Sequence, residues 1–482
     1  MERMSAQDAS FLHIEDDTTP MHVGGVSIFE GPPPPFKEFQ AMIASKLPLV
    51  PRYRQVVRFV PVALSRPVWV DDPHFNLAYH VRRTALPSPG GDGELKTLTA
   101  RVMSQNLDRA KPLWEIWVVE GLDDNRWALL SKVHHCMVDG VASTDLMAVL
   151  FDAEREPTRE LPIDEWRPEP MPSEARLVAG ALADRIANPF AAAEALAGSL
   201  RAPRELAALV EQTASGVVRS AGIVRSPPAS SLNGPLSPHR RWSWARGRLA
   251  DVQLARKAHG GTVNDVVLAA ITGGFRELLQ SRGESTDRVL RTMVPVSVRR
   301  PGERGTYNNR VSAMFAELPV GEADPVARLR SITAQMAGLK DSKQAVAGEV
   351  LTSLSGFAPP MLLALGARLA SRLPQRALNT GTTNVPGPQF PLYAAGRRLL
   401  ESFPYIPLFA HVRLAVAIFS YDGGLYFGVS GDYDSTPDIE VLCEGIERGL
   451  AQLIVLDSPS SSSSSSGAPS DGDSRPVESS TP

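Results

Sequence analysis

The sequence feature that most constrains the fold is a short polar motif set between two apolar segments. The motif His-His-Cys-Met-Val-Asp-Gly, at residues 134–140, follows the apolar stretch Trp127–Val133 and precedes a helical pattern over Gly140–Phe151. A short apolar run bounded by polar residues predicts a buried strand, and apolar spacings of three and four predict a helix. The motif is therefore expected at a strand-to-helix turn of an α/β fold.

The two adjacent histidines of the motif are predicted to have different roles. Successive residues of a strand point to opposite faces of its sheet. Of His134 and His135, one then faces a functional site and the other faces the packing behind it. A histidine at the end of an apolar strand can also be an ordinary hydrogen-bonded core residue, and that alternative stays open at this point.

Several common kinds of catalytic site do not fit the sequence. Adjacent histidines are poorly placed to share one tetrahedral zinc ion, no H-E-x-x-H motif is present, and Cys136 has no second cysteine nearby. The chain also lacks the G-x-S-x-G turn of serine hydrolases and the glycine-rich phosphate-binding motifs. A neutral imidazole, with an ordinary pKa of about 6.5, can instead take a proton from a substrate hydroxyl. This chemistry suits direct acyl transfer from a thioester to an alcohol.

The overall composition argues against some partners and compartments. The formal net charge is -3, from 50 basic and 53 acidic residues, whereas nucleic-acid binding requires a concentrated basic face. Cys136 and Cys443 cannot form a disulfide framework, so a reducing cytoplasm is expected. The N-terminus lacks a signal-like apolar region, and the uncharged run Val350–Ala367 is interrupted by Pro359 and Pro360. We therefore expect a cytoplasmic protein that is soluble or peripheral to a membrane.

Changes in composition divide the chain into four segments. Residues 1–160 and residues 241–456 each mix strand-like and helical patterns, which predicts two α/β halves. Residues 161–240 are expected to form an Ala-rich helical linker that ends in the Pro-rich sequence SPPASSLNGPLSPHRR. Residues 457–482 are mostly Ser, Pro, Gly and Asp, and such a segment is expected to be disordered.

Individual elements are also predicted within the two halves. Besides the strand at Trp127–Val133, the pattern favours a strand at Val23–Phe29 in the first half. In the second half it favours a helix over Val263–Gln280 and three strands, at Arg291–Val298, Arg413–Ser420 and Leu425–Gly431.

The motif at 134–140 resembles the H-H-x-x-x-D-G signature of the coenzyme A-dependent acyltransferase superfamily, which includes chloramphenicol acetyltransferase and peptide-synthetase condensation domains. Further segments, in order along the chain, resemble those of the bacterial wax ester synthase/diacylglycerol acyltransferases, including the triacylglycerol synthases of mycobacteria. The resemblance covers residues 4–456, and its other segments are Pro20–Gly24, Pro112-Leu113-Trp114, Asn264-Asp265, Pro295–Ser297, Asn308–Arg310 and Asn384–Pro388.

The resemblance implies a fold, a reaction and a set of substrates. The fold is α/β, with two chloramphenicol acetyltransferase-like domains that meet at a central active-site channel. The reaction moves a long-chain acyl group from acyl-coenzyme A, which is a substrate and not a cofactor, to the free hydroxyl of diacylglycerol or of a long-chain alcohol. No metal and no tightly held cofactor are implied.

The resemblance also assigns roles to residues of the motif. His135 would be the general base, His134 would be mostly structural, Asp139 would orient the site through an arginine ion pair, and Gly140 would leave room for substrate. A donor for the oxyanion of the tetrahedral intermediate is also needed, and Thr383 or Asn384 is the candidate.

Each of these motifs also has an ordinary structural interpretation. Asp139-Gly140 and Asn264-Asp265 could cap the helices that follow them, because Asp and Asn are common at helix starts. Pro112-Leu113-Trp114 fits core packing or a tunnel wall, and Asn384–Pro388 has the composition of a tight turn.

Three functions remain open from the sequence. The first is a diacylglycerol acyltransferase, with or without wax ester synthesis. The second is an acyltransferase of the same fold that acts on another lipid alcohol, and the third is a non-catalytic protein that binds lipid bodies. In each case a membrane surface or lipid droplet is the expected partner. The segment Pro359–Leu373, with Arg368 and Arg372, could lie on anionic lipid as an amphipathic helix or pack as an ordinary one.

Overall fold

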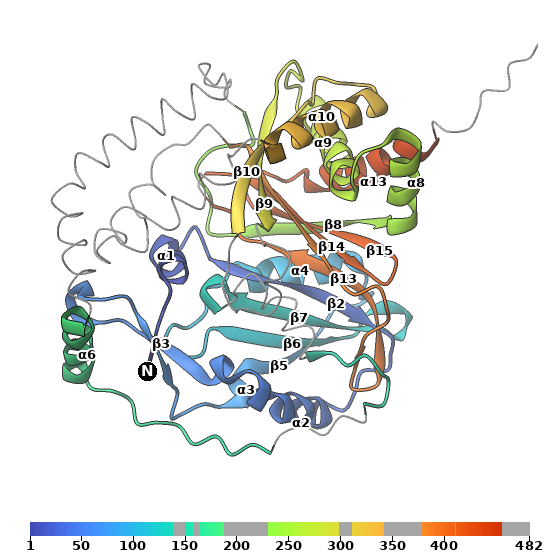
Figure 1. Cartoon of the computed structure of the whole chain (residues 1–482). Coiled ribbons are helices and arrows are strands. Elements are labelled where there is room, and N and C mark those ends of the chain that lie inside the picture. Colours follow the sequence, from blue (N-terminus) through green and yellow to red (C-terminus); the bar gives the residue numbers. More distant parts are fainter. Residues whose placement is uncertain are drawn as a thin grey trace, which may run out of the picture.

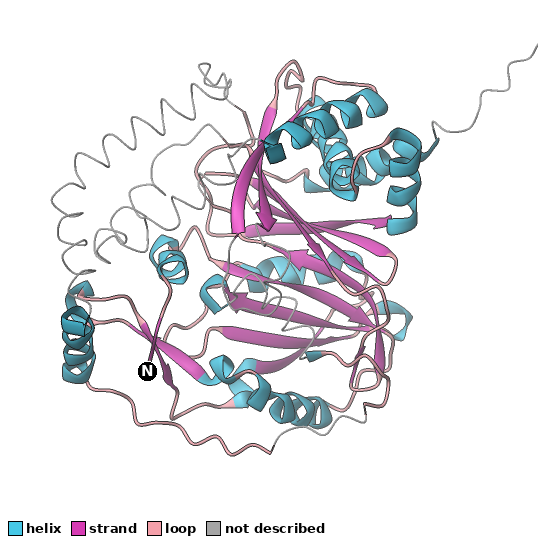
Figure 2. Ribbon diagram, viewed as in Figure 1, coloured by secondary structure: helices cyan, strands magenta, loops and turns pink. Residues whose placement is uncertain are grey.

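A computed structural model describes seven stretches of the 482-residue chain: 1–137, 150–157, 163–187, 230–297, 311–341, 378–409 and 411–455. They form two six-stranded sheets and one three-stranded sheet, with helices packed around them (Figures 1 and 2). Mixed strands and helices in both halves confirm the predicted α/β class. The predicted helix at 140–151, the segments 308–310 and 359–373 and the tail at 457–482 lie wholly or mostly outside the described residues.

The first large sheet carries the histidine motif. Its strand order is β12-β13-β2-β7-β6-β5, and every neighbouring pair is antiparallel except β5 with β6. The apolar segment before the motif becomes β7, near the middle of the sheet, because strands flank it on both sides and bury it. The strands are β2 (His22–Phe29), β5 (Val81–Ala85), β6 (Trp114–Glu120), β7 (Trp127–His134), β12 (Tyr393–Ala394) and β13 (Arg397–Tyr405).

Among the described residues, four helices pack around this first sheet. They are α1 (Ala6–Ile14), α2 (Phe36–Lys46), α3 (Leu77–His80) and α4 (Asp92–Met103). In Figure 1, α2 and α3 lie below the first sheet, and α4 lies between the two large sheets. Large aromatic side chains fill the core here, with the ring of Phe29 stacked on that of Trp127 at 4.6 Å between centroids.

The second large sheet has the order β10-β9-β11-β14-β15-β8 and is covered by four helices on its outer face (Figure 1). Helices α9 and α13 pack so closely that a Cβ added to Gly445 would lie 2.8 Å from Cα of Gly274, so this crossing requires glycine. The strands are β8 (Arg240–Arg248), β9 (Leu290–Ser297), β10 (Val311–Leu318), β11 (Thr380–Pro386), β14 (Leu414–Tyr421) and β15 (Gly424–Asp432). The helices are α8 (Leu249–His259), α9 (Val263–Ser281), α10 (Pro325–Asp341) and α13 (Ile439–Val455).

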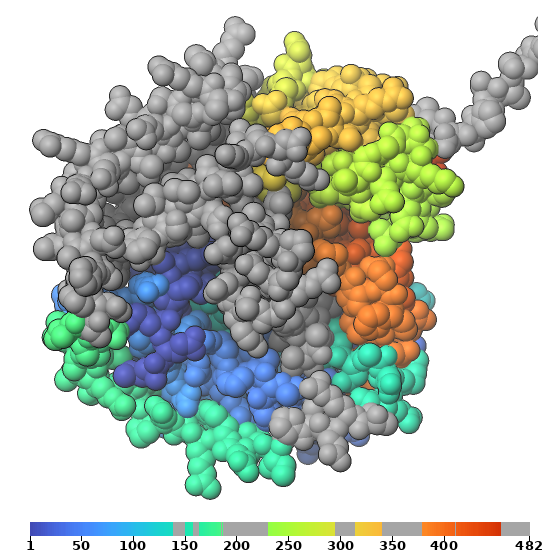
Figure 3. All heavy atoms as spheres, viewed as in Figure 1, coloured from blue at the N-terminus to red at the C-terminus, as the bar shows by residue number. Residues whose placement is uncertain are grey.

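A small third sheet lies at the side of the first half. It contains β1 (Glu2–Arg3), β4 (Val68–Asp71) and β3 (Gln55–Arg58), in that order. Helix α6 (Glu174–Ala187) covers it by packing Leu177 among buried valines of β3 and β4. Of the predicted Ala-rich helical segment at 161–240, residues 163–187 and 230–240 are described, and α6 lies in the first of these stretches. Residues 163–187 run along the outer rim of the first half (Figure 3).

One strand pair joins the two halves of the chain. β13 comes late in the sequence, yet it pairs with β2 of the first sheet, with Phe403 opposite Val26. β13 also packs against β15, where a Cβ added to Gly428 would lie 1.6 Å from the carbonyl oxygen of Pro404. The division of the chain near residue 240 stays a prediction, and the structure adds that residues 393–405 complete the sheet of the other half.

The predicted strands and the predicted second-half helix are confirmed within one or two residues. They correspond to β2, β7, β9, β14, β15 and α9. Among the helices that the structure describes, none is both long enough and apolar enough to cross a bilayer.

Candidate functional site

The two histidines lie where β7 ends and a single 3-10 turn, η5 (His135–Met137), begins. Their backbone N–H groups donate to carbonyl oxygens of two other segments. His134 donates to Leu113 at 2.9 Å, and His135 donates to Met21 at 2.8 Å. The end of β7 is thus fixed on both sides, which confirms the predicted position of the motif at a strand end.

The side chains of the two histidines have different surroundings. The ring of His134 is buried, its Nδ1 accepts the N–H of Cys136 at 3.1 Å, and its Nε2 lies 3.0 Å from Oε2 of Glu15. The ring of His135 stacks on Phe11 of α1, with centroids 4.0 Å apart. Nδ1 of His135 is buried and has no hydrogen-bond partner among the described residues. His134 therefore lies against a carboxylate, whereas the ring of His135 lies against an aromatic side chain.

The surroundings of His135 keep its imidazole neutral. Burial, with a smaller contribution from the positive charge that His134 can carry, lowers the pKa of His135 to about 4. An imidazole with this pKa is neutral near pH 7 and can accept a proton. The ring is therefore in the protonation state that a general base requires.

Glu15, the residue after α1, lies behind His134 and was not predicted from the sequence. Its side chain is only 3% exposed, and it accepts hydrogen bonds from the N–H of Met21 at 3.0 Å and from Arg109 at 2.9 Å. Burial raises the pKa of Glu15, but the hydrogen bond from His134, the positive charge that His134 can carry and the hydrogen bond from Met21 outweigh it and bring the pKa down to about 2. Glu15 is thus an ionised carboxylate that ties α1 to the histidine motif.

A third histidine completes this buried polar group. His22 lies opposite His134 in the β2–β7 ladder, and its Nε2 accepts the N–H of Leu107 at 3.3 Å and lies 3.9 Å from Glu15. Burial holds the pKa of His22 well below its ordinary value, so this ring is neutral. A sequence signal did exist for His22, because it belongs to the segment Pro20–Gly24.

The arginine ion pair behind the motif was predicted to involve Asp139. Asp139 and Gly140 lie outside the described residues. The ion pair that the structure does describe behind the histidines joins Arg109 to Glu15.

The segment Pro112-Leu113-Trp114 lies directly beside the motif. Leu113 accepts the backbone N–H of His134, as described above, and the carbonyl oxygen of Pro112 accepts the N–H of Trp114 at 2.9 Å. The indole of Trp114 is buried, donates to the carbonyl oxygen of Tyr53 at 2.8 Å, and stacks on His80. These contacts are core packing that also positions His134. A role of this segment in substrate binding stays a prediction.

In the second half, Asp265 lies in the first turn of α9 and exchanges hydrogen bonds with Thr262, the N-cap residue of that helix. Its carboxylate accepts the N–H of Thr262 at 2.8 Å, and its own N–H donates to the hydroxyl of Thr262 at 3.2 Å. This reciprocal pair is a capping box at the start of α9. The structural interpretation of Asp265, as a residue that caps a helix, is therefore confirmed.

Asn264 and Asn384 come together although they are far apart in the sequence. The amide of Asn384, on β11, donates to Oδ1 of Asn264 at 3.4 Å, a long hydrogen bond. Thr383 lies next to Asn384 on the same strand and is half-buried. No described contact joins Thr383 or Asn384 to His135, so the oxyanion role stays a prediction.

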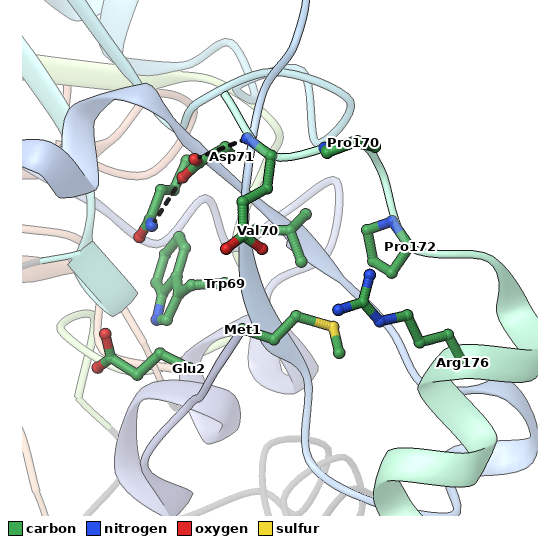
Figure 4. A pocket seen from close by; sticks show the side chains of 10 residues that line it. Met1, Glu2, Trp69, Val70, Asp71, Pro170, Pro172 and Arg176 are labelled. Atoms are coloured by element: carbon green, nitrogen blue, oxygen red, sulfur yellow. Dashed lines mark hydrogen bonds between the residues drawn. The ribbon is translucent and has the colours of Figure 1, made fainter. Parts of the chain in front are cut away.

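A pocket of about 260 Å³ lies elsewhere, on the small third sheet. It is open on one side, and Asp71 at its wall is already occupied by hydrogen bonds from Gln55 and from the N–H of Glu169 (Figure 4). Its lining includes Met1, Trp69, Glu169, Pro172 and Arg176, and His135 is not part of it. Within the described stretches, no three His, Cys, Asp or Glu side chains are grouped so that they could hold a metal ion.

The chain matches one protein family over most of its length. Residues 4–267 match the wax ester synthase/diacylglycerol acyltransferase catalytic domain, and residues 307–454 match the WS/DGAT C-terminal domain. A probable diacylglycerol O-acyltransferase of Mycobacterium tuberculosis is 40% identical over 459 residues, covering 95% of this chain and 96% of the relative. A putative one of Mycobacterium bovis matches to the same extent.

Solved structures agree with this match. The wax ester synthase/diacylglycerol acyltransferase of Marinobacter aquaeolei superposes with a TM-score of 0.66 and 26% identity, covering 94% of this chain and 99% of the other. A condensation domain of the calcium-dependent antibiotic synthetase, at 18% identity and a TM-score of 0.55, covers 94% and 96% and shares the fold. The predicted coenzyme A-dependent acyltransferase architecture is thus confirmed, and the chain belongs to the wax ester synthase/diacylglycerol acyltransferase family.

Proposed function

We propose that this protein transfers a long-chain acyl group from acyl-coenzyme A to the free hydroxyl of diacylglycerol, with His135 as the general base. Family membership supports the reaction. The observation that carries the role of His135 is its environment, because the imidazole is neutral, is held by its backbone at the end of β7 and is stacked on Phe11 of α1.

The proposed reaction needs no acyl-enzyme. The hydroxyl of diacylglycerol gives its proton to His135 while its oxygen attacks the thioester carbonyl, and a tetrahedral intermediate forms. The C–S bond then breaks, and the protonated imidazole returns the proton to the departing thiolate of coenzyme A. The products are triacylglycerol and free coenzyme A, and His135 is neutral again.

We further propose that Glu15 is a positioning residue for both histidines. Its carboxylate lies against Nε2 of His134 and so fixes that ring directly. It also accepts the N–H of Met21, whose carbonyl oxygen accepts the N–H of His135. Since Glu15 directly follows α1, it also anchors the helix whose Phe11 supports the ring of His135.

The second half would complete the site. Thr383 or Asn384 is our candidate for the donor to the oxyanion, a contact that is typically worth about 100-fold or more in rate. Asn264 would position Asn384 by accepting a hydrogen bond from its amide, and Asp265 would stabilise the first turn of α9, the helix that carries Asn264. Asp139 and Gly140 keep the roles that the family motif implies, orienting the site and leaving room for substrate.

The proposed partners follow from the substrates. Acyl-coenzyme A is consumed as a substrate, and no resident cofactor is proposed. Diacylglycerol is a lipid of membranes, so we propose that the protein works at the cytoplasmic face of a membrane or on a lipid droplet. The alternative is the same chemistry on another lipid alcohol, including the synthesis of wax esters.

A transfer assay with two acceptors tests the proposed reaction. Radiolabelled palmitoyl-coenzyme A is supplied with diolein or with hexadecanol, and wild-type protein is compared with His135→Ala. We expect labelled triacylglycerol from the wild type and not from the variant. The ratio of labelled triacylglycerol to labelled wax ester measures the preference of the enzyme between the two acceptors. Folded wild-type protein that makes neither product would contradict the proposal and favour another acceptor or a binding role.

A further inference from the structure

An exposed apolar face lies on the side of the first half, and we call it the docking face. It consists of Phe59 and Val62, at the turn η3 (Pro61–Ala63), and of Leu182 and Ile186 on α6. Val62 is 89% exposed and Ile186 is 79% exposed, while Phe59 and Leu182 are nearly half exposed. Isolated exposed apolar side chains are ordinary, but a group on adjoining elements marks an interaction surface.

Helix α6 has apolar residues on two opposite sides. Leu177 and Ala181 are buried, and Leu177 packs among the valines of the small sheet. Ala175, Ala179, Leu182 and Ile186 are exposed and follow the spacing of four, three and four that puts residues on one side of a helix. Since the inner side already supplies the packing within the described chain, the outer stripe is available to a partner.

Arg3 connects the two parts of the docking face. Its guanidinium donates to the hydroxyl of Ser65 at 2.5 Å and to the carbonyl oxygen of Arg66 at 3.1 Å, just after η3. The same guanidinium forms an ion pair with Asp184 on α6. The turn and the helix are therefore held in one arrangement.

The turn also has an unusual backbone. Val62 and Ala63 both adopt positive φ angles, of 50° and 48°. This region is unfavourable for residues with a Cβ, and especially for a branched one such as valine. Backbone strain of this kind tends to persist at functional positions. Here it accompanies an apolar side chain that is turned almost fully toward solvent.

The charges around the docking face suit a negatively charged partner. Residues 51–66 contain four arginines and no acidic residue. Arg52 and Arg54 are paired with Glu2 and Asp164, but exposed Arg58, beside Phe59, has no ion-pair partner among the described residues. An apolar group bordered by arginine matches the boundary between phosphate headgroups and acyl chains.

The docking face also adjoins the helix that supports the catalytic histidine. The ring of Phe59 contacts the ring of His13 on α1, with centroids 6.1 Å apart. Two residues earlier on α1, Phe11 stacks on His135. A surface bound at Phe59 would therefore lie close to the site that consumes a lipid substrate.

We propose that the docking face binds an anionic lipid surface, with Phe59, Val62, Leu182 and Ile186 entering the acyl region and Arg58 at the phosphates. This inference rests on the proposed function, because it gives the route by which a membrane-borne acceptor reaches the site. Transferring the side chains of Val62 and Ile186 from water to lipid stabilises the bound state, and each contributes about tenfold in affinity or more.

Vesicle flotation of the full chain tests this proposal without any need for turnover. The vesicles contain phosphatidylcholine alone or mixed with phosphatidylglycerol. We expect wild-type protein to float with the anionic vesicles, and less so at high salt because the charges are screened. Val62→Asp and Ile186→Asp should each weaken binding by about tenfold, and Arg58→Glu should weaken binding to the anionic vesicles selectively.

Leu254→Asp is the matched control. Leu254 is 56% exposed on α8, which lies on the opposite side of the molecule from α6 in Figure 1, so this variant should bind like the wild type. Each variant is also assayed with detergent-dispersed diolein, where turnover should equal that of the wild type. Suppose that the wild type binds vesicles through the docking face but makes no triacylglycerol. This result would contradict the proposed function and would still support the docking face as a lipid-binding surface.

Three results would overturn the proposal. One is unchanged flotation of the Val62→Asp and Ile186→Asp variants. Another is a large drop in melting temperature for Ile186→Asp, which would show that the outer stripe packs against another segment of the chain. The third is a wild-type dimer, seen by light scattering, that becomes monomeric in these variants while their flotation is unchanged. This result would show that the face is an interface between two copies of the chain.

Discussion

The two halves of the molecule bring different kinds of polar group to the proposed site. In the first half, an ionised and buried Glu15 is surrounded by donors from His134, Met21 and Arg109. In the second half, neutral amides of Asn264 and Asn384 meet, and Asp265 caps its own helix. Removing one partner of a buried charged group costs several kcal/mol, whereas removing a cap costs about 1 kcal/mol. We therefore infer that the first half provides the buried charge and the proton transfer. The second half would hold neutral polar groups in position.

The largest effect is expected for His135→Ala. Without its proton acceptor, turnover should fall by about 100-fold or more. The protein should remain folded, and the loss of the stacking of this ring on Phe11 should lower its melting temperature. Steady-state rates with palmitoyl-coenzyme A and diolein, together with thermal unfolding, measure both quantities. His239→Ala, at an exposed position, is the control. A folded His135→Ala protein with normal turnover would remove His135 from its proposed role.

The difference between the halves also separates what sequence reasoning could and could not predict. The end of β7 was predictable, because Trp127–Val133 is apolar and the polar motif follows at once. The capping role of Asp265 could also be considered from the sequence, because capping involves residues that are close together in the chain. Glu15 was not predictable, because its partner Arg109 lies 94 residues away and no local pattern links the two.

Pairing between strands that are distant in the sequence could not be predicted either. β13 has an ordinary strand pattern, and its pairing with β2 depends on contacts between Leu399–Tyr405 and Gly24–Phe29 that no local spacing encodes. The approach of Asn384 to Asn264 is likewise a product of tertiary packing. Sequence reasoning thus found the elements and the motif, and the structure was needed to find the residues that support the motif.

The next largest effect is expected for Glu15→Gln. Glutamine keeps the size of the side chain but removes the charge that faces His134 and Arg109. We expect turnover to fall by about tenfold or more and the free energy of unfolding to fall by about 1–3 kcal/mol, since Arg109 is partly exposed and screened. The KM for acyl-coenzyme A should change little, because Glu15 lies behind the motif.

The control for this variant is Glu38→Gln, an exposed glutamate on α2. A positioning role also predicts a changed pH profile, since the arrangement around both histidines depends on the carboxylate. If Glu15→Gln were less stable but retained full turnover and the wild-type pH profile, Glu15 would hold the fold together without positioning His135.

The pH dependence of the wild type gives a third prediction. The pKa of His135 is lowered to about 4, so the base becomes protonated, and kcat/KM is lost, only as the pH falls through that range. At pH 5.5, an unperturbed imidazole would be about one tenth neutral, whereas His135 should be almost fully neutral, a difference of nearly tenfold. An acid limb at the ordinary histidine pKa, in protein shown to be folded at that pH, would contradict the closed environment described for His135.

The same shift has a consequence for stability. The unfolded chain binds a proton at this histidine below about pH 6.5, and the folded protein does so only near pH 4. The contribution of His135 to the free energy of unfolding is therefore complete above pH 6.5 and is lost as the pH falls toward 4. Urea unfolding at several pH values measures it, with the His135→Ala variant as the reference that lacks the contribution.

The smallest effect on turnover is expected for Asp265→Ala, and it tests the second half. The variant loses the capping box at the start of α9, so the free energy of unfolding should fall by about 0.5–2 kcal/mol. Turnover at a temperature well below unfolding should stay within about threefold of the wild type, because capping energies act on the fold and not on proton transfer. Asp265→Asn should recover part of the stability, since asparagine also caps. If turnover instead fell as far as in Glu15→Gln while stability was unchanged, the second half would carry catalytic charge, and the contrast between the two halves would be wrong.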